Sequence, residues 1–133
     1  MPDGSTPLVR KLGLKAGQRA FVFDAPPHYA GVLGPLPGGL RLLTAPEPEL
    51  DFAQLFVPVR GALEARLPEV VPLLSRHGML WICWPKKTSP LALDLAAGDV
   101  RAAGLAAGLV DVKVCAIDAD WSGLKFVYRR ADR

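Results

Sequence analysis

Residue types that bind ligands or move protons follow the apolar runs of this sequence, at the points where strands would end. These candidates are Asp24, His28, Tyr29, Arg60, Trp84, Lys86, Lys87, Ser89 and Trp121. If the runs form one parallel sheet, the candidates lie along the edge made by the carboxyl ends of its strands, where open parallel sheets bind ligands. We call this edge the carboxyl rim, and we expect any ligand of the protein to bind there.

The segment 86–89, Lys-Lys-Thr-Ser, has the composition of an anion site. Two ammonium groups and two hydroxyls at the end of a strand suit a phosphate or a carboxylate. The alternative is a solvated loop whose lysines pair with Asp118 and Asp120, because exposed lysines are common and contribute little on average. The sequence leaves these two interpretations open.

The two histidines and the strand-end tryptophans each have a functional and a structural interpretation. His28 can act as a general acid or base near neutral pH, the role for which histidine is best suited, with Asp24 orienting its imidazole. No nucleophile motif such as GxSxG accompanies it, so a packing or capping role is the alternative. His77 is expected at a helix end, where it interacts favourably with the helix dipole. Trp84 and Trp121 can stack on a flat ligand or close the core.

The two cysteines, Cys83 and Cys115, lie in separate strand-like runs. They lack CxxC spacing, and no nearby histidine completes a metal site. We therefore expect buried free thiols in a reducing cytosol, and we expect neither a metal nor a cofactor.

The composition is that of one ordinary globular domain. The chain has 133 residues, of which 50% are hydrophobic, so it can bury a single core without disulfides or metal. We expect a flexible segment over residues 1–6 and one domain over residues 7–133. The first residues are polar, and the longest apolar run, 79–84, is far shorter than the roughly 20 residues that span a bilayer. We therefore expect a cytoplasmic protein without a secretion signal or a membrane span.

The charge balance disfavours nucleic acid as a partner. The formal net charge is +3, from 16 basic and 13 acidic residues. Lys and Arg are interspersed with Asp and Glu, whereas binding by counterion release needs a stripe or cluster of cations.

Four apolar runs predict buried strands at residues 20–23, 40–43, 52–57 and 79–84. Each is closed by a proline or a polar turn, and none alternates between apolar and polar residues, which favours parallel strands covered on both faces. The later segments 110–117 and 124–129 do alternate, which predicts a hairpin with one strand at a solvent-exposed edge.

Helical spacing over residues 63–74 and an Ala- and Leu-rich segment at 99–107 predict two crossover helices. Because a proline inside a helix costs about 3 kcal/mol, we expect Pro68 to kink the first helix or to begin a second piece. Gly78 is the expected stop of this first helix, and Gly108 is that of the second. The sequence therefore predicts a small, mostly parallel, Rossmann-like three-layer α/β sheet with a terminal antiparallel hairpin.

This order of elements resembles the class I S-adenosylmethionine-dependent methyltransferases, from about residue 8 to residue 130. The matching segments are LGLKAGQRAFVFD at 12–24, LDFAQLFV at 50–57, LLSRHGMLWI at 73–82 and AAGLVDVK at 106–113. They correspond to the family's first strand, its fourth strand, its fifth strand with the preceding helix end, and its last crossover. Within this group the chain resembles short bacterial proteins of uncharacterised function that have a Trp-Pro-Lys, here 84–86, and a Trp-Ser, here 121–122.

The chain departs from the methyltransferase pattern at the cofactor site. The family's first strand runs into a loop with several glycines, whereas here the residues after Asp24 are Ala25, Pro26, Pro27, His28 and Tyr29. The two prolines remove backbone donors, and the larger side chains fill space. The family's acidic ribose-binding residue has only Glu47 as a counterpart, and about eight residues between the second and third runs are too few for a parallel crossover, so one αβ unit is missing.

We therefore expect a shortened methyltransferase-like fold that does not catalyse a reaction and uses no cofactor. Its expected ligand is an unidentified protein partner or a small anion at the carboxyl rim. The alternative is a divergent small-molecule enzyme, such as an atypical methyltransferase, that uses His28 and Lys86. A homodimer formed through an exposed apolar patch is a third alternative.

Overall fold

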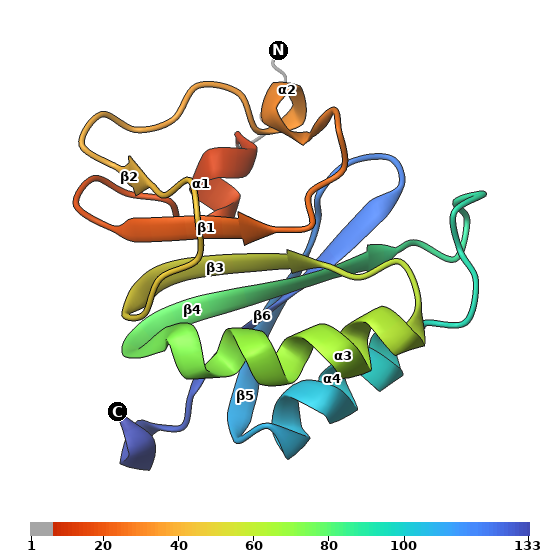
Figure 1. Cartoon of the computed structure of the whole chain (residues 1–133). Helices are drawn as coiled ribbons and strands as arrows, with labels where there is room; N and C mark the ends of the chain where they lie inside the picture. The colour runs from red at the N-terminus through yellow and green to blue at the C-terminus, as the bar shows by residue number, and fades with distance from the viewer. Residues whose placement is uncertain (1–6) are drawn as a thin grey trace.

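The four apolar runs form the parallel part of one sheet in the computed structural model, which describes residues 7–133 (Figure 1). The segment 1–6, expected to be flexible, lies outside the described residues. The strands are β1 (Arg19–Phe23), β2 (Arg41–Leu42), β3 (Leu50–Phe56), β4 (Leu74–Pro85), β5 (Leu109–Ala116) and β6 (Trp121–Tyr128). The α-helices are α1 (Leu8–Leu12), α2 (Tyr29–Leu33), α3 (Arg60–Val70) and α4 (Ala97–Ala106), and the 3-10 turns are η1 (Val71–Leu73) and η2 (Arg130–Asp132).

The strand order in the sheet is β2-β1-β3-β4-β6-β5. The first four strands in this order pair in parallel, and β6 pairs antiparallel with both β4 and β5. The predicted α/β fold with a terminal antiparallel hairpin is therefore confirmed. Only residues 43–49 separate β2 from β3. This link contains no helix and strand, so the crossover unit is missing, as the short spacing predicted.

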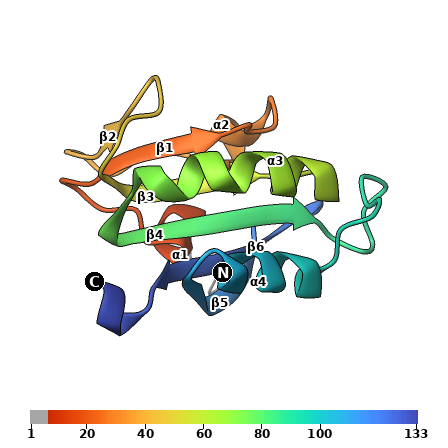
Figure 2. The same cartoon turned by 60° about the horizontal axis from the view of Figure 1, so that its bottom comes forward.

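Helices cover both faces of the sheet, which makes three layers (Figures 1 and 2). On one face, Leu63 and Leu67 of α3 and Val100 of α4 pack against strand residues such as Leu80 and Phe126. On the other face, residues around α1 and α2 pack against a second set of strand residues, including Phe52 and Trp81. We call these the α3–α4 face and the α1–α2 face.

The first crossover differs from the prediction around its prolines. Helix α3 continues through Pro68 to Val70, and Pro72 lies in the following 3-10 turn. Pro68 lies in the last turn of the helix and is exposed, and as a proline it supplies no N–H to the carbonyl of Glu64. Buried Leu63, Leu67 and Val70 keep the helix on the sheet despite the missing donor.

Gly78 does not end a helix, and His77 does not lie at one; both are residues of β4, and His77 is exposed. A Cβ atom at Gly78 would lie 2.5 Å from the carbonyl oxygen of Leu50. Glycine is therefore required there because the backbones of β3 and β4 approach closely, not because a helix stops. The error arose because apolar periodicity near 74 fits either a helix end or a strand start.

The edge strand β5 contains a bulge. Asp111 pairs with Phe126 and Lys113 pairs with Lys125, so the three residues 111–113 of β5 face only two residues of β6. The extra residue is Val112, whose side chain is 52% exposed. A bulge shifts the alternation of side chains by one residue, so Asp111 and Lys113 face opposite sides of the sheet.

No helix of the described part is long and apolar enough to cross a membrane.

Candidate functional site

The carboxyl rim consists of the loop 24–28 after β1, the loop 86–89 after β4 and the turn 117–120 before β6. His28 Nε2 lies 3.4 Å from Asp118 Oδ2, and the backbone N–H of Lys86 donates to the carbonyl of Asp120 at 2.8 Å. The turn therefore joins the two loops, and the predicted residues His28 and Lys86 both contact it, from different sides.

Asp24 does not orient His28, contrary to the prediction. Its two carboxylate oxygens accept hydrogen bonds from Arg66 of α3, at 2.8 Å from Nε and 3.2 Å from Nη2. Asp24 has a positive φ of 58°, a conformation that aspartate adopts more readily than most residues, and this turns the carboxylate toward α3. The imidazole of His28 instead faces Asp118, which also accepts from the backbone N–H groups of Asp120 and Trp121.

Tyr29 is in the core and not on the rim surface, with 4% of its side chain exposed. Its hydroxyl donates to Gln54 Oε1 at 2.7 Å, and Gln54 Nε2 donates to Cys83 Sγ at 3.4 Å. Burial raises the pKa of the Tyr29 hydroxyl, and burial also raises the pKa of the Cys83 thiol, to about 12. Both groups are therefore neutral at physiological pH.

Both rim tryptophans are buried, which is the structural interpretation offered for them. Trp84 packs on the α3–α4 face, and Trp121 packs on the α1–α2 face, edge-on to Phe56 at 5.1 Å between ring centroids. The indole N–H of Trp121 is buried without a hydrogen-bond partner in the described residues. Neither ring is placed to stack on a ligand at the surface.

The remaining rim candidates divide into paired and unpaired groups. Ser89 donates to Asp120 Oδ1 at 2.9 Å and is buried, while Arg60 pairs with Asp99 of α4 at 3.0 Å. Lys86 and Lys87 form no ion pair within residues 7–133, so the pairing with Asp118 and Asp120 that was the alternative interpretation is not observed. No described cavity is lined by both lysines, and an anion site at these residues stays a prediction.

The rim contains an apolar pocket of about 330 Å³ between the carboxyl ends of β1 and β2. We call it the β1–β2 pocket; its lining includes Phe21, Pro26, Pro27, Leu33, Leu36 and Leu43. The one polar group in its lining side chains is the Tyr29 hydroxyl, which is already bonded to Gln54. Glu47, the only counterpart of a ribose-binding acid, pairs with Arg19 at the opposite, amino end of β1.

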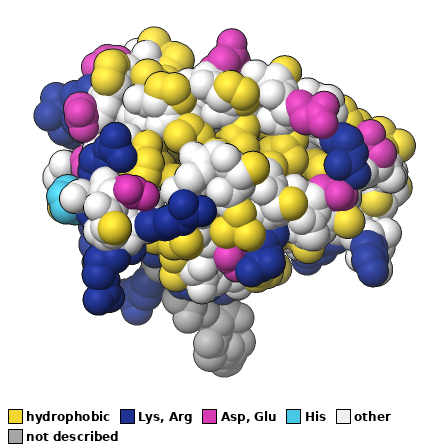
Figure 3. Space-filling view, turned by 90° about the horizontal axis from the view of Figure 1, so that it is seen from below, with side chains coloured by type: hydrophobic (Ala, Val, Ile, Leu, Met, Phe, Trp, Pro, Cys, Tyr) yellow, Lys and Arg dark blue, Asp and Glu magenta, His cyan; other side chains and the backbone are white. Residues whose placement is uncertain are grey.

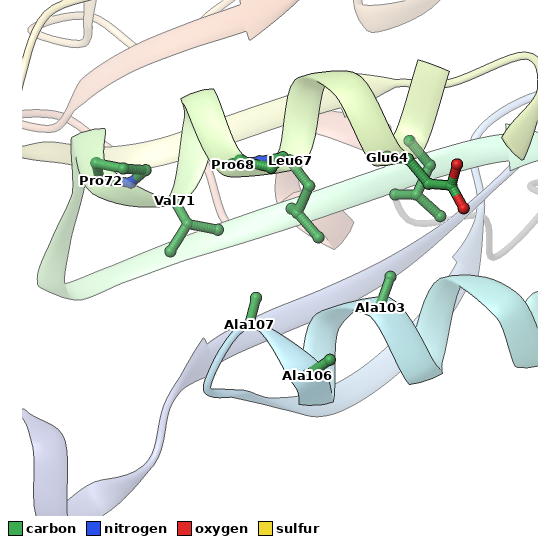
Figure 4. Close-up of a pocket in the computed structure, with 9 residues that line it drawn as sticks. Glu64, Leu67, Pro68, Val71, Pro72, Ala103, Ala106 and Ala107 are labelled. Carbon is green, nitrogen blue, oxygen red and sulfur yellow. The ribbon is translucent and has the colours of Figure 1, made fainter. Parts of the chain in front are cut away.

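A second apolar cavity, of about 480 Å³, lies between α3 and α4. Hydrophobic side chains gather across this face of the molecule, with charged side chains around them (Figure 3). Leu67 and Val71 lie opposite Ala103, Ala106 and Ala107, whose small side chains leave the groove open (Figure 4). The apolar patch that a homodimer would need is thus available, and dimerisation itself stays a prediction.

Arg66 and Gln54 take part in the rim but were not predicted. Gln54 carries a signal, because it is a polar residue inside the apolar run 52–57 and a buried amide needs a partner. Arg66 carries none, since one arginine in an amphipathic helix resembles any solvated residue. No cluster of three or more potential metal ligands occurs within residues 7–133.

No family model and no curated protein sequence matches the chain. Solved structures, however, do match it in fold. A TehB-like S-adenosylmethionine-dependent methyltransferase from Corynebacterium glutamicum is 12% identical, with a TM-score of 0.55 over 92% of this chain and 85% of that one. The magnesium protoporphyrin IX methyltransferase from Synechocystis, solved with bound S-adenosylmethionine, is 13% identical, with a TM-score of 0.58 over 92% and 74% of the two chains. This chain therefore has a shortened class I methyltransferase-like fold.

Proposed function

We propose that this protein is a non-catalytic binding domain that uses its methyltransferase-like fold to hold an apolar group of a protein partner in the β1–β2 pocket. The main support is that the carboxylates and hydroxyls that line this end of the sheet are engaged by the chain itself. Asp24 is bound to Arg66, Ser89 to Asp120, and Tyr29 to Gln54. What remains open is an apolar pocket, and such a pocket takes apolar groups with few polar contacts.

S-adenosylmethionine is a poor fit for this end of the sheet. Its charged sulfonium and amino acid groups and its ribose hydroxyls need donors and acceptors. Pro26 and Pro27 supply no backbone N–H, and Glu47 is at the wrong end of β1. Several unmade hydrogen bonds, each costing about 1–3 kcal/mol when a buried polar group is left unpaired, disfavour the cofactor.

The test titrates two probes into the whole protein and follows backbone amides by NMR. Indole stands for an apolar side chain of a partner and is expected to shift the backbone amides of residues 42–43 and of the residues other than proline in 25–36. Ala30→Trp fills the pocket and should abolish these shifts, whereas Ala102→Trp, the same change on the exposed surface of α4, should preserve them. Saturable S-adenosylmethionine binding at micromolar concentration, in competition with indole, would refute the proposal.

The second candidate is the divergent enzyme, and the contact of His28 with Asp118 supports it. A carboxylate facing an imidazole can fix its tautomer and its orientation, and the side chain of His28 is 58% exposed and thus accessible to a substrate. Hydrolysis of p-nitrophenyl acetate faster than by free imidazole, lost in His28→Gln and reduced in Lys86→Met, would favour this candidate. Equal rates in all three proteins would exclude it for ester hydrolysis.

A further inference from the structure

Four lysines gather on the α1–α2 face of the terminal hairpin, away from the carboxyl rim. Lys11 belongs to α1, Lys15 follows that helix, Lys113 lies on β5 and Lys125 lies on β6. Lys113 and Lys125 are directly opposite each other across the β5–β6 ladder. We call this group the lysine face.

The register of the sheet places the two strand lysines together. Leu124 and Phe126 pack on the α3–α4 face, so Lys125 between them points to the other side. Lys113 would share a face with Asp111 in a regular strand, but the bulge at Val112 turns it to the side of Lys125.

Helix α1 brings the other two lysines to the same region. Trp81, which pairs with Lys125 across β4 and β6, donates its indole N–H to the carbonyl of Leu12 at 2.9 Å. Gln18 then holds the next loop, because its side chain donates to the Gly13 carbonyl at 3.1 Å and accepts from the Lys15 N–H at 2.8 Å. The end of α1 and the loop that carries Lys15 are thereby fixed beside the strand lysines.

No carboxylate balances these charges within residues 7–133. None of the ion pairs of the described residues includes one of the four lysines, and Asp111 is turned to Arg101 on α4, 3.2 Å away. Burial lowers the pKa of the Lys125 ammonium, and the charges of Lys113 and Lys15 lower it further. Like charges directly opposite in a ladder are destabilising, so the arrangement favours the uptake of anionic charge.

We propose that the lysine face binds a ligand that carries two or more adjoining phosphate groups. Ammonium groups from four positions can surround several phosphate oxygens, whereas one carboxylate would leave most of the positive charge unbalanced. Trp81, the aromatic residue in the same row of the sheet, is fully buried, so a base or sugar ring finds nothing to stack on. Recognition therefore rests on the phosphates, whether they belong to a free oligophosphate or to the tail of a nucleotide.

The test compares phosphate, pyrophosphate and tripolyphosphate at constant ionic strength, by calorimetry and by NMR of lysine side chains. We expect affinity to rise in that order, with shifts at Lys15, Lys113 and Lys125. Lys113→Glu changes the charge by two units at an exposed site and should weaken tripolyphosphate binding about a hundredfold, at about tenfold per unit of charge. Arg41→Glu makes the same change on exposed β2, at the opposite edge of the sheet, and should alter binding less than about twofold.

Further probes separate the sources of phosphate and the competing explanations. If ATP binds as tightly as tripolyphosphate and adenosine does not bind, the phosphates are the recognised groups. If adenosine binds at the same lysines, the proposal is overturned. If Lys113→Glu and Arg41→Glu weaken tripolyphosphate binding equally, the ligand is attracted only by the net charge of the protein, which also overturns the proposal. Single-stranded RNA that binds far more tightly than tripolyphosphate, with a steep dependence on salt, makes the face a nucleic-acid surface instead. No binding of tripolyphosphate at millimolar concentration refutes the site.

Discussion

The carboxyl rim and the lysine face differ in whether their charged and polar side chains find partners within the chain. At the rim, Asp24 is held by Arg66, Ser89 donates to Asp120, and Asp118 accepts from two backbone N–H groups of its own turn. At the lysine face, Lys113 and Lys125 oppose each other without an acidic partner in the described residues. Apart from Lys86 and Lys87, which form no ion pair in the described residues, the edge where this fold ordinarily binds ligands is therefore self-satisfied, whereas the opposed lysines of the hairpin are not.

The difference follows from backbone freedom. Rim residues lie in loops and turns, which adjust until each polar group finds a partner. The ladder fixes the backbone and the Cβ positions of strand residues, so the stems of two opposed lysines stay close together. Five predictions test the contrast, from the largest expected effect to the smallest.

Truncation of Tyr29 is expected to have the largest effect, because this rim residue is part of the core. Tyr29→Ala removes a buried ring that packs edge-on to Phe56 at 4.8 Å, and should lower the free energy of unfolding by about 3–5 kcal/mol. Tyr29→Phe leaves the Gln54 oxygen unpaired and should cost about 1–3 kcal/mol in urea denaturation. Tyr128→Phe, whose hydroxyl makes only a 3.4 Å contact with the Val71 carbonyl, is the control and should cost less. A near-zero change in the free energy of unfolding for Tyr29→Ala would mean that Tyr29 lies at the rim surface and not in the core.

Two groups with shifted pKa values, Cys83 near the rim and Lys125 on the lysine face, should make opposite contributions to the alkaline pH dependence of stability. The folded protein keeps the Cys83 thiol protonated up to a pKa of about 12, whereas the unfolded chain ionises near pH 8.5. This contribution to stability is complete below pH 8.5 and falls as pH rises, by about 1.4 kcal/mol per unit between pH 9 and 10. Cys83→Ala should reduce this slope in urea denaturation, leaving the part due to Cys115 and Tyr29, whose pKa values are also raised by burial. An unchanged slope would show that Cys83 does not contribute.

Lys125 should contribute in the opposite direction. Its pKa is lowered in the folded protein, so its charged form destabilises the fold at neutral pH, and stability is recovered as pH rises through the folded pKa toward about 10.4. Lys125→Gln should therefore make the alkaline loss of stability steeper than in the parent protein. A shallower loss would contradict the assignment.

Reversing one charge of the lysine face should stabilise the protein modestly. Lys113→Glu replaces a like-charge pair with an opposite-charge pair facing Lys125, worth about 0.2–1 kcal/mol in the free energy of unfolding. The gain should shrink at high salt, because these side chains are partly solvated. A destabilised Lys113→Glu protein would contradict the prediction, because it would mean that the two lysines are not in repulsive contact.

The ion pair of Asp24 with Arg66 should contribute least. Both side chains are partly exposed, so a double-mutant cycle of Asp24→Asn and Arg66→Gln should give a coupling of about 0.2–1 kcal/mol. Asparagine tolerates the positive φ at position 24, so the cycle isolates the side-chain contact. No coupling would mean that Asp24 is free to bind a ligand at the rim, which would weaken the contrast between the regions.

The fold could be predicted from the sequence because its signals are local. Apolar runs that end at prolines mark the parallel strands, the alternation after residue 109 marks the hairpin, and the short link before β3 reveals the missing unit. The prediction that a second helical piece begins at Pro68 was wrong. The free-energy cost of a proline depends on its position in the helix and on the packing of Leu63 and Leu67, and helix propensities include neither.

The partners of the side chains could not be predicted in the same way. Asp24 and Arg66 are 42 positions apart, and nothing near either one marks the other. The lysine face depends on the bulge at Val112, since simple alternation places Lys113 beside Asp111 and away from Lys125. Such features depend on register and on backbone angles, which the sequence specifies only through the complete fold.

The same bulge bears on how copies of this protein meet one another. Strand β5 is an edge strand of the sheet and pairs only with β6. Val112 and Val114 are exposed on it, and a regular edge strand of this kind would offer its free backbone N–H and C=O groups to the sheet of a second copy. The extra residue bends the strand and breaks the even spacing of those groups, which hinders strand-to-strand association. Deleting Val112 should therefore convert a monodisperse protein into one that associates as its concentration rises, with growing β-sheet content.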